Sequence, residues 1–297
     1  MNILLVRSGG LGDAVLTLPV IHHIKELNPE ARLHILGNET VLAVMRRTGL
    51  GDVFHSLDAG RFSGIYSDAE PSKFLKSFFS DFHTVYFFTA ANKEKIEHFI
   101  KEAGVKSCRV LDPRLPPDRH GHIVYHLMSI LEDSHLPSSH PFFPVIKCEH
   151  MPAKKRNRLL IHPGSGSHSK NWPLERFIHL ADKLDVPATF LMGPAEIECG
   201  MENDIPVNRF NVVITESLDE LCSVLCGAKI YIGNDSGVSH CASLCDTPSL
   251  VLFGPTDPAI WRPLGLNVRV ISSFNGTMEG ISTRKVIKAL KKTTFPN

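Results

Sequence analysis

The stretch KIYIGNDSGVSHCASLCDTPSLVLFGPTD, residues 229–257, contains two successive strand and turn units. Its first residues, 229–233, are β-branched and aromatic enough to predict a buried strand, and residues 249–253 predict a second one. A polar turn follows each strand. Residues 238–245, between the strands, predict a helix whose N-terminus presents free backbone N–H groups at the first turn.

Both turns carry side chains that can bind an anion or a hydroxyl group. Asp235, Ser236 and Gly237 follow the first strand, and Thr256 follows the second. Parallel strands bring such loops to one edge of a sheet, where ligands bind. Asn, Asp, Gly and Pro are also the usual residues of turns, and for one loop alone that explanation is equally good. The other loops of the chain must decide between the two interpretations.

The composition is that of an ordinary globular protein. The chain has 297 residues, of which 43% are hydrophobic and 21% charged, with a net charge of +1. A chain of this length favours two domains. The small net charge gives no basic field for nucleic acid. No apolar run approaches the ~18 residues of a membrane-spanning helix, and the N-terminal segment does not have the pattern of a signal peptide.

Seven cysteines occur without a CxxC pair or a regular disulfide spacing, as is typical of a reducing cytoplasm. Two i,i+4 pairs, Cys222 with Cys226 and Cys241 with Cys245, lie near His240 and raise the question of a metal site. The spacing matches known zinc patterns poorly. We therefore expect no metal, and we interpret these cysteines as small buried hydrophobic residues.

A glycine-rich turn follows the first predicted strand. Residues 2–6 form that strand, Gly9, Gly10 and Gly12 form the turn, and Asp13 opens a helix. The turn is neither a Walker A loop nor a dinucleotide-binding fingerprint, because neither spacing is present. It is a place where the backbone can approach a ligand closely, with a carboxylate at its edge.

Asp13 has two interpretations. As the first residue of a helix, it would be a favoured N-cap whose charge suits the helix dipole. As a functional residue, it would be a general base that takes a proton from a hydroxyl group. The residues alone favour the cap.

Predicted strands and helices alternate along both halves of the chain, which indicates βαβ units and mostly parallel sheets. A Gly- and Ser-bearing segment, residues 58–72, is expected to be a mobile loop on the ligand side. Residues 137–158 contain four prolines and little periodicity, and they are the best candidate for an interdomain linker. The predicted strands elsewhere are residues 32–36, 53–57, 84–88, 107–111, 158–162, 186–192 and 268–271, and the predicted helices are residues 13–27, 39–48, 71–82, 93–103, 120–132, 173–184, 218–226 and 282–292.

Basic residues are concentrated in the first half. We expect most of them to form a solvated face, though some could contact an anionic acceptor. They are Lys93, Lys95, Lys101, Lys106, Arg109, Arg114 and Arg119.

The second half has further polar loops after its strands. Ser165, Gly166, Ser167 and Lys170 stand in a Gly/Ser loop that could wrap a phosphate, although a solvated loop is the simpler alternative. The turn after residues 186–192 carries Glu196, which could accept hydrogen bonds from ribose hydroxyls; Glu198 is the rival choice. Four strand-end loops of this half therefore share one kind of chemistry, which a single loop could not establish.

At this point the sequence resembles glycosyltransferase family 9, the bacterial lipopolysaccharide heptosyltransferases and their relatives. The matching stretches run in family order, cover nearly the whole chain and are specific in combination. They are RSGGLGDAVLTLP, HGHIVYHLMSIL, HPGSGSHSKNWPLERF, GPAE and NDSGVSHCASLCDTPSLVLFGPTDPAIWRPLG.

The resemblance implies a fold of the α/β class with GT-B architecture, in which two Rossmann-like domains with mostly parallel sheets face each other across a cleft. Residues 1–150 would bind the acceptor and residues 151–297 the nucleotide-sugar donor, and the last helix could pack back on the first domain. The resemblance also implies an inverting transfer without a metal or other cofactor.

The resemblance further assigns roles to residues. Asp13 would be the base, which reverses the preference for a cap, with Gly9, Gly10 and Gly12 near the acceptor. Glu196 would hold the ribose. The donor phosphate and sugar would contact Ser165, Gly166, Ser167, Lys170, Asp235, Ser236, Gly237 and His240, with Thr256 nearby.

The expected activity is transfer of a heptose from ADP-heptose to the lipopolysaccharide inner core. The alternatives are a relative with another nucleotide sugar or acceptor, including a protein, and a non-catalytic module that binds a sugar nucleotide. The expected location is the cytoplasm, with possible peripheral contact at the inner membrane and no nucleic-acid partner.

Overall fold

The computed structural model describes residues 1–67, 70–132, 143–146, 158–184 and 186–291. The chain divides into two compact units, Met1–Pro144 and Val145–Asn297, each with its own sheet. The domain boundary expected between residues 150 and 151, and most of the expected linker, lie outside the described residues.

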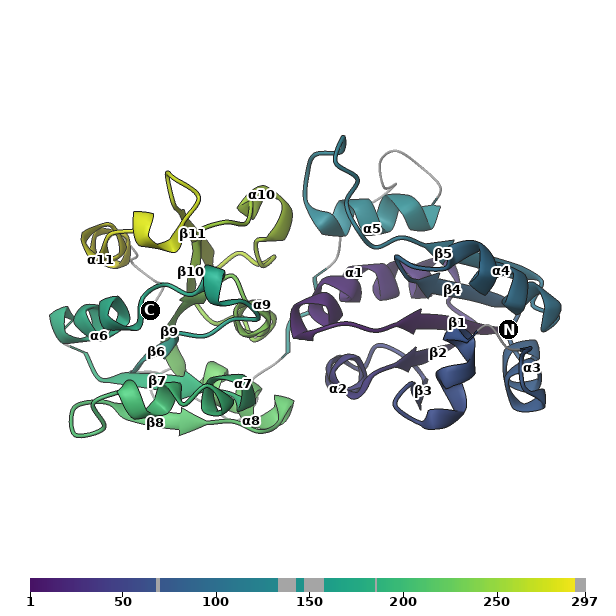
Figure 1. Cartoon of the computed structure of the whole chain (residues 1–297), viewed down its shortest axis with the longest axis horizontal. Coiled ribbons are helices and arrows are strands. Elements are labelled where there is room, and N and C mark those ends of the chain that lie inside the picture. Colours follow the sequence, from purple (N-terminus) through teal and green to yellow (C-terminus); the bar gives the residue numbers. More distant parts are fainter. Residues whose placement is uncertain (68–69, 133–142, 147–157, 185, 292–297) are drawn as a thin grey trace. The chain divides into compact units, whose positions relative to one another are not determined.

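The first unit is built around a five-stranded sheet in the order β3-β2-β1-β4-β5, in which every pair of neighbours is parallel. A helix follows each strand, as Figure 1 shows. The strands are β1 (Asn2–Arg7), β2 (Arg32–Gly37), β3 (Val53–Ser56), β4 (Thr84–Phe88) and β5 (Ser107–Leu111). The helices are α1 (Leu11–Leu27), α2 (Glu39–Thr48), α3 (Lys73–Ser80), α4 (Lys93–Glu102) and α5 (Ile123–Glu132).

Both faces of this sheet are buried, which explains why its central strand is a continuous apolar run. On β1, Leu4 and Val6 pack into a cluster with residues of α3 and α4. Successive side chains point to opposite faces, so the equally buried Ile3 and Leu5 point to the other side. Helix α1 packs against both α2 and α5. The expected alternation of helices and strands is confirmed.

The segment expected to be a mobile loop contains regular structure. Residues Gly60–Tyr66 form a 3-10 helix, η1, and its Phe62 and Ile65 are almost completely buried in the core. The Phe62 ring lies edge-on to those of Phe74 and Phe78 on α3. The prediction gave more weight to Gly and Ser as loop residues than to these two apolar side chains, and it was wrong for this part of the segment.

The second unit has a six-stranded parallel sheet in the order β11-β10-β9-β6-β7-β8. Its strands are β6 (Arg158–His162), β7 (Ala188–Met192), β8 (Asn211–Ile214), β9 (Ala228–Asn234), β10 (Ser249–Phe253) and β11 (Val268–Ser272). Its helices are α6 (Leu174–Lys183), α7 (Pro194–Glu198), α8 (Leu218–Cys226), α9 (Gly237–Leu244), α10 (Pro258–Trp261) and α11 (Thr283–Lys291), with 3-10 turns η3 (His168–Lys170), η4 (Met201–Asp204) and η5 (Met278–Gly280). Strand β8 and the short helices α7 and α10 were not predicted.

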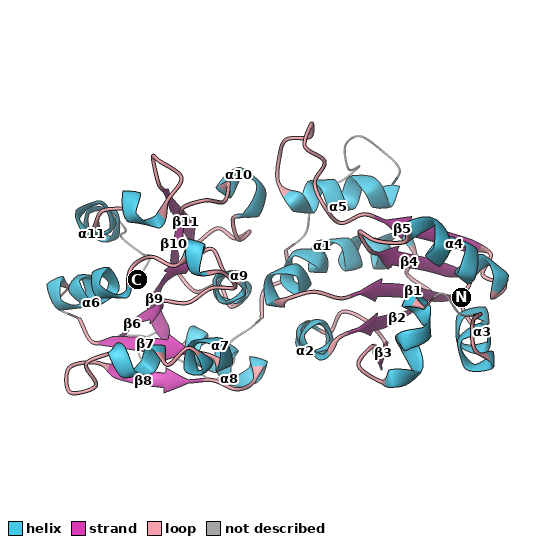
Figure 2. Cartoon of the chain, viewed as in Figure 1, coloured by secondary structure: helices cyan, strands magenta, loops and turns pink. Residues whose placement is uncertain are grey.

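Helices cover both faces of the second sheet. In Figure 2, α6 and α11 lie on one side of the strands, and α8 and α9 lie on the other. Trp172 is buried beneath α6; its ring stands edge-on to Phe177, and its indole N–H donates to the carbonyl of Ile281 at 2.8 Å. Val286 of α11 belongs to the same core, so the last helix packs against α6 of its own unit.

Each sheet reverses its strand order at one place, and such switch points are where α/β sheets bind ligands. In the first unit the reversal lies between β1 and β4, so the glycine turn after Arg7 leaves the sheet there. In the second unit it lies between β6 and β9, so the loops that begin at Pro163 and Asp235 meet there. The topology therefore brings the predicted loops to the binding edge of each sheet.

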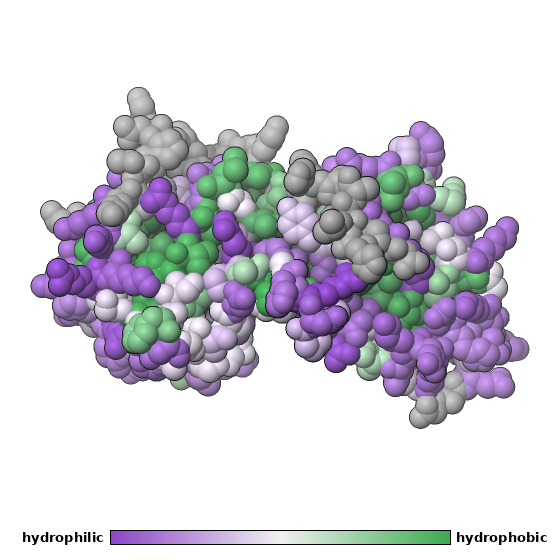
Figure 3. All heavy atoms as spheres, turned by 90° about the horizontal axis from the view of Figure 1, so that it is seen from above, coloured by the Kyte–Doolittle hydropathy of each residue, from purple (hydrophilic) through white to green (hydrophobic). Residues whose placement is uncertain are grey.

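None of the helices in the described part of the chain is both long enough and apolar enough to cross a membrane. On the face shown in Figure 3, hydrophilic residues cover much of both units, with smaller hydrophobic areas among them.

A histidine pair in the first unit makes stability depend on pH. Nδ1 of His34 on β2 lies 3.0 Å from Nε2 of His55 on β3, and the two rings are stacked. Burial is the main cause that lowers both pKa values; Arg32 adds to this effect at His34, whereas His34 and Arg61 add to it at His55. Asp52 and Asp81 oppose it at His34. The folded protein therefore binds fewer protons here than the unfolded chain does.

We expect the free energy of unfolding to be highest above pH ~6.5, the ordinary pKa of histidine, and to fall as the pH drops below that value. Urea denaturation between pH 7.5 and 5.5 would measure the slope. His55→Gln should reduce the slope, whereas His98→Gln, at an exposed position on α4, should leave it unchanged. An unaltered slope in His55→Gln would contradict this origin.

Candidate functional site

In the second unit, three of the predicted residues meet, because two of them contact the same carboxylate oxygen of the third. Lys170 Nζ lies 2.8 Å from Oδ2 of Asp235, and the hydroxyl of Thr256 donates to the same oxygen at 2.7 Å. The Asp235 side chain is 7% exposed, whereas that of Lys170 is 31% exposed. These residues come from three loops, after β6, β9 and β10, so the sheet edge brings together what the sequence separates.

Helix α9 begins beside this cluster. Its N-cap is Ser236, whose hydroxyl accepts the N–H of Ser239, and Gly237 is its first residue. His240 follows in the first turn and is buried. The free N–H groups and the positive end of the helix dipole therefore lie next to the ammonium group of Lys170. This arrangement suits an anion with several oxygens.

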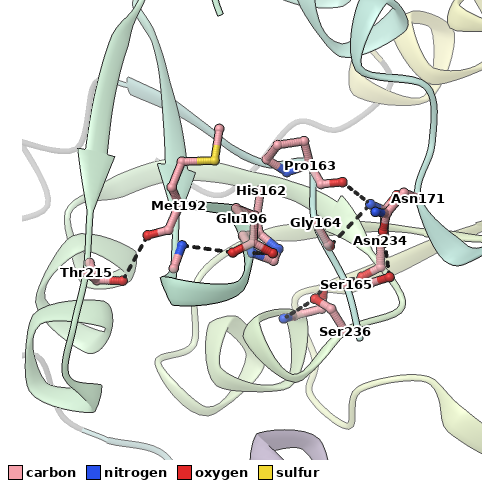
Figure 4. Close-up of polar contacts among 12 residues, drawn as sticks. His162, Pro163, Gly164, Ser165, Asn171, Met192, Glu196, Thr215, Asn234 and Ser236 are labelled. Carbon is pink, nitrogen blue, oxygen red and sulfur yellow. Dashed lines mark hydrogen bonds and ion pairs between the residues drawn. The ribbon is translucent and has the colours of Figure 1, made fainter. Parts of the chain in front are cut away.

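A buried residue that was not predicted as a site residue joins these loops. Asn234, the last residue of β9, is completely buried, and its Nδ2 donates to the carbonyls of Pro163 at 2.7 Å and Gly164 at 3.3 Å. Its Oδ1 accepts the N–H of Trp172 at 3.1 Å. Figure 4 shows Asn234 beside the loop that follows β6. Asn234 thus holds both ends of the segment that carries Lys170.

The remaining residues of that loop are mostly exposed. Ser165 Oγ lies 2.6 Å from Oδ1 of Asn171 and 2.8 Å from the carbonyl of Ser167, which closes the loop on itself. Gly166 and Ser167 are exposed at its tip. These positions offer backbone N–H groups and hydroxyls, and the carbonyl of Ser167 accepts the N–H of Lys170 at 2.9 Å, which joins the loop tip to the Lys170 cluster.

Glu196 lies at a different place in the second unit. It is the third residue of α7 and is 6% exposed; its Oε2 accepts the N–H of Gly193 at 2.9 Å, and its Oε1 lies 3.5 Å from His162 Nε2. Burial opposes ionisation, but the contact with His162 and the hydrogen bond from Gly193 together hold the pKa of Glu196 below its usual value. Figure 4 shows the side chain of Glu196 beside His162, close to the segment that contains Gly164. Its rival Glu198 is exposed.

In the first unit, each carboxylate oxygen of Asp13 has a partner. Oδ1 lies 3.1 Å from Nη2 of Arg7, and Oδ2 accepts the N–H of Gly10 at 3.1 Å. Asp13 is the third residue of α1, which begins at Leu11, so it caps Gly10 from within the helix. The expectation that Asp13 opens the helix was two residues late, because Leu11 and Gly12 already have helical geometry.

Arg7 was not predicted as a site residue. Its side chain is 8% exposed, Nε donates to Thr17 Oγ1 at 3.3 Å, and the guanidinium lies over the ring of Phe88. Burial lowers its pKa, and the charge of Asp13 opposes that shift. An arginine nevertheless stays charged in proteins, so Arg7 supplies a fixed positive partner for Asp13. Its place at the end of a buried strand was the only signal in the sequence.

Gly9 is the residue of the turn that must be glycine. Its φ is +150°, and a Cβ atom there would lie 2.8 Å from Cβ of Asp13. The side chain of Asn38, the N-cap of α2, donates to the carbonyl of Gly9 at 3.0 Å. The glycine turn is therefore held by Asn38, which follows β2, and by Asp13 of α1. Gly12 lies inside the first turn of α1.

The cysteines behave largely as expected of small buried residues. Cys222, Cys241 and Cys245 are buried, and burial raises the pKa of the Cys241 thiol. Cys226 is the exception, because it is disulfide-bonded. The interpretation of Cys226 as a free cysteine was therefore wrong. Among the described residues, no group of three or more His, Cys, Asp or Glu side chains could hold a metal ion.

Solved structures with the same fold include heptosyltransferases. The structure of the ADP-heptose lps heptosyltransferase II of Escherichia coli matches with a TM-score of 0.77 and 17% identity, over 98% of each chain. The glycosyl transferase family 9 structure from Veillonella parvula DSM 2008 matches with a TM-score of 0.78 and 18% identity, over 98% of this chain and 96% of that one. The fold is thus the GT-B fold of two parallel-sheet α/β domains, as predicted.

The sequence profile of Glycosyltransferase family 9 (heptosyltransferase) matches residues 132–291, more than half of the chain. Lipopolysaccharide heptosyltransferase 3 of Escherichia coli (strain K12) is 23% identical over 313 aligned positions, which cover 95% of this chain and 90% of that protein. The chain therefore belongs to glycosyltransferase family 9, and it is a glycosyltransferase.

The contact between Glu196 and Gly164 gives a test of the second unit's site. A Cβ atom at Gly164 would overlap the Glu196 carboxylate, whereas one at Gly166 would meet open space. We expect Gly164→Ala to lower the free energy of unfolding by about 1–3 kcal/mol, because Glu196 must leave its place against His162. Gly166→Ala should change it by less than ~0.5 kcal/mol. Equal urea midpoints for the two variants would show that Gly164 and Glu196 are not in contact.

Proposed function

We propose that this glycosyltransferase transfers a heptose from ADP-heptose to the lipopolysaccharide inner core, with inversion and without a metal ion. The observation that carries this proposal is the cluster of Lys170, Asp235 and Thr256 beside the N-terminus of α9. It has the charges and donors that a nucleoside diphosphate needs. The names of the relatives, which are lipopolysaccharide heptosyltransferases, supply the proposed sugar and acceptor.

In the proposed reaction, the acceptor hydroxyl attacks the anomeric carbon as the bond from that carbon to the diphosphate oxygen breaks. The nucleoside diphosphate leaves with the bonding electron pair and gains negative charge. Lys170 and the N–H groups at the start of α9 would stabilise that charge. Ser165, Gly166 and Ser167 would close over the phosphates from the loop after β6, and Ser236, Gly237 and His240 would line the other side.

Asp13 is the proposed base that takes the proton from the acceptor hydroxyl. A carboxylate has about four lone-pair sites, so the contacts with Arg7 and Gly10 leave room for the hydroxyl. Arg7 pairs with the carboxylate and limits its rotation. Gly9, Gly10 and Gly12 would let the acceptor approach the backbone closely.

Glu196 is proposed as the ribose contact because its Oε1 lies against Gly164, in the loop after β6 that also carries Lys170. Its present partners are His162 and Gly193. Ribose hydroxyls would donate to the remaining lone pairs of a carboxylate that is already held ionised. The exposed Glu198 lacks such preorganisation.

We propose a cytoplasmic enzyme that reaches its acceptor at the inner membrane by peripheral contact.

Asp13→Asn tests the proposed base. The amide keeps the size of the side chain and can still accept from Gly10, but it cannot take a proton. We expect kcat to fall by about 10²–10⁴-fold. The melting temperature should also fall, because the buried Arg7 loses its counterion, so the rate is measured at a temperature at which the variant is folded. A transfer assay read by mass spectrometry, with ADP-heptose and lipopolysaccharide core acceptors, would measure the rate. A near-normal rate in a folded Asp13→Asn protein would refute the role of Asp13.

Lys170→Ala tests the donor site by itself. Loss of a charge-assisted contact to phosphate should weaken ADP binding by about tenfold or more. Lys183→Ala removes an equal charge from the exposed last turn of α6 and serves as the control. Calorimetric titration with ADP would give both affinities. The donor site would be misplaced if the two variants bound ADP equally well, and binding of another nucleotide in place of ADP would replace ADP-heptose as the donor.

A further inference from the structure

His162, the last residue of β6, is a buried histidine to which the proposed reaction assigns no step. It is 2% exposed, and it lies where the strand passes into the loop that carries Lys170. Its Nε2 lies 3.5 Å from Oε1 of Glu196, and Figure 4 shows the two side chains beside each other. Strand β6 and helix α7 thus place a histidine against the carboxylate that is proposed to hold the ribose.

The carboxylate of Glu196 is buried with little to balance its charge. Among the described residues, no lysine or arginine forms an ion pair with it. Gly193 donates to Oε2, and the contact with His162 is at Oε1. At 3.5 Å, the His162 contact is longer than an ordinary hydrogen bond of roughly 2.7–3.2 Å. Oε1 therefore keeps the capacity to accept from a further donor.

The other ring nitrogen of His162 is left without a partner. Nδ1 is buried and makes no hydrogen bond within the part of the chain that the structure describes. A carboxylate accepts, so Nε2 is the nitrogen that donates toward Glu196. Such a half-satisfied polar pair stabilises a core poorly, because apolar side chains of similar size would leave no polar atom unpaired. Packing alone does not explain this histidine, whereas orientation of the Glu196 carboxylate does.

Gly164 restricts the same carboxylate from a third side. A Cβ atom at Gly164 would overlap Oε1 of Glu196, so the carboxylate lies directly against the backbone of the loop after β6. With Gly193 at one oxygen and His162 at the other, the carboxylate has little freedom to rotate. A carboxylate fixed in this way accepts best from hydroxyls that are themselves fixed, as on a sugar ring.

We propose that His162 is a positioning residue that orients the Glu196 carboxylate toward the ribose hydroxyls of the donor, and that this pair makes the enzyme select nucleotides with those hydroxyls. The ribose hydroxyls would donate to Glu196, whereas a deoxy analogue would leave lone pairs of a buried carboxylate without a donor. His162 would act through Glu196 and would not contact the nucleotide. The inference rests on the proposed function, because it requires that the second unit bind a nucleoside diphosphate with Glu196 at the ribose.

The affinities of ADP and 2′,3′-dideoxy-ADP, measured by calorimetric titration of the full-length protein, test this pair without any transfer. The wild type should bind ADP about tenfold or more tightly than the dideoxy analogue. His162→Leu should reduce this preference to about threefold or less, and it should leave the affinity for the dideoxy analogue within about twofold of the wild type. A loss of structure would instead weaken both ligands together.

Two further changes at His162 sharpen the test. His162→Gln should retain most of the preference, because its amide N–H can still donate to the carboxylate. His162→Phe keeps a ring and removes the donor, so it should lose the preference and it replaces His162→Leu if that variant unfolds.

The control variants use Glu196 and a second buried histidine. Glu196→Gln should lose the preference, and the double variant with His162→Leu should show no further loss, because His162 acts only through Glu196. His23 of α1 is 4% exposed, and its Nε2 lies 2.7 Å from Oε1 of Glu132. His23→Leu therefore removes the same kind of contact from the first unit, and it should leave both affinities unchanged.

The outcomes separate this inference from the proposed function. A wild-type protein that does not bind ADP would refute both. Equal wild-type affinities for ADP and the dideoxy analogue would refute Glu196 as the ribose contact and keep the Lys170 cluster as the phosphate site. A preference that Glu196→Gln abolishes, but that His162→Leu and His162→Phe retain, would refute the role of His162 alone. A further loss in the double variant would show that His162 contacts the nucleotide itself, which would also overturn the positioning role.

Discussion

The second unit depends on the buried amide of Asn234. Its three hydrogen bonds join the end of β9 to both ends of the loop after β6, through Pro163, Gly164 and Trp172. Each of these backbone groups would otherwise be a buried donor or acceptor without a partner, at a cost of about 1–3 kcal/mol. Only a side chain with a donor and an acceptor in one plane can satisfy them all, so Asn234 connects the packing of the sheet to the position of Lys170.

The first unit solves a similar problem with charge. Arg7 ends a buried strand, where a guanidinium needs a counterion, and Asp13 provides it from the first turn of α1. Gly9 makes this possible, since a Cβ at that position would collide with Asp13. The arrangement stabilises the fold and also orients a carboxylate that is 46% exposed. One residue can therefore cap its helix and serve chemistry, and the two interpretations of Asp13 do not exclude each other.

The sequence predicted most of the fold because buried parallel strands are continuous apolar runs, and the turns after them are rich in Gly, Ser and Asp. The prediction from sequence failed for elements whose secondary structure depends on tertiary contacts. Strand β8 is short and lies at the edge of the sheet, and η1 is helical because Phe62 and Ile65 find the core. In the candidate site of the second unit, the sequence pattern places Lys170, Asp235 and Thr256 in loops, but only the strand order brings these three residues together. Arg7 and Asn234 were missed because their roles come from burial, which single loops do not reveal.

The Lys170 cluster explains how the proposed diphosphate site can be stable without a ligand. A lysine beside a helix N-terminus would be repelled by the dipole, and Asp235 offsets that repulsion with an ion pair at 2.8 Å. A diphosphate would bring more negative charge to the same ammonium, so it must compete with Asp235. Thr256 eases that exchange, because its hydroxyl already donates to the oxygen that Lys170 would leave. The carboxylate would keep one partner when the lysine turns to phosphate, which lowers the cost of binding at a site where desolvated charges cannot be left unpaired.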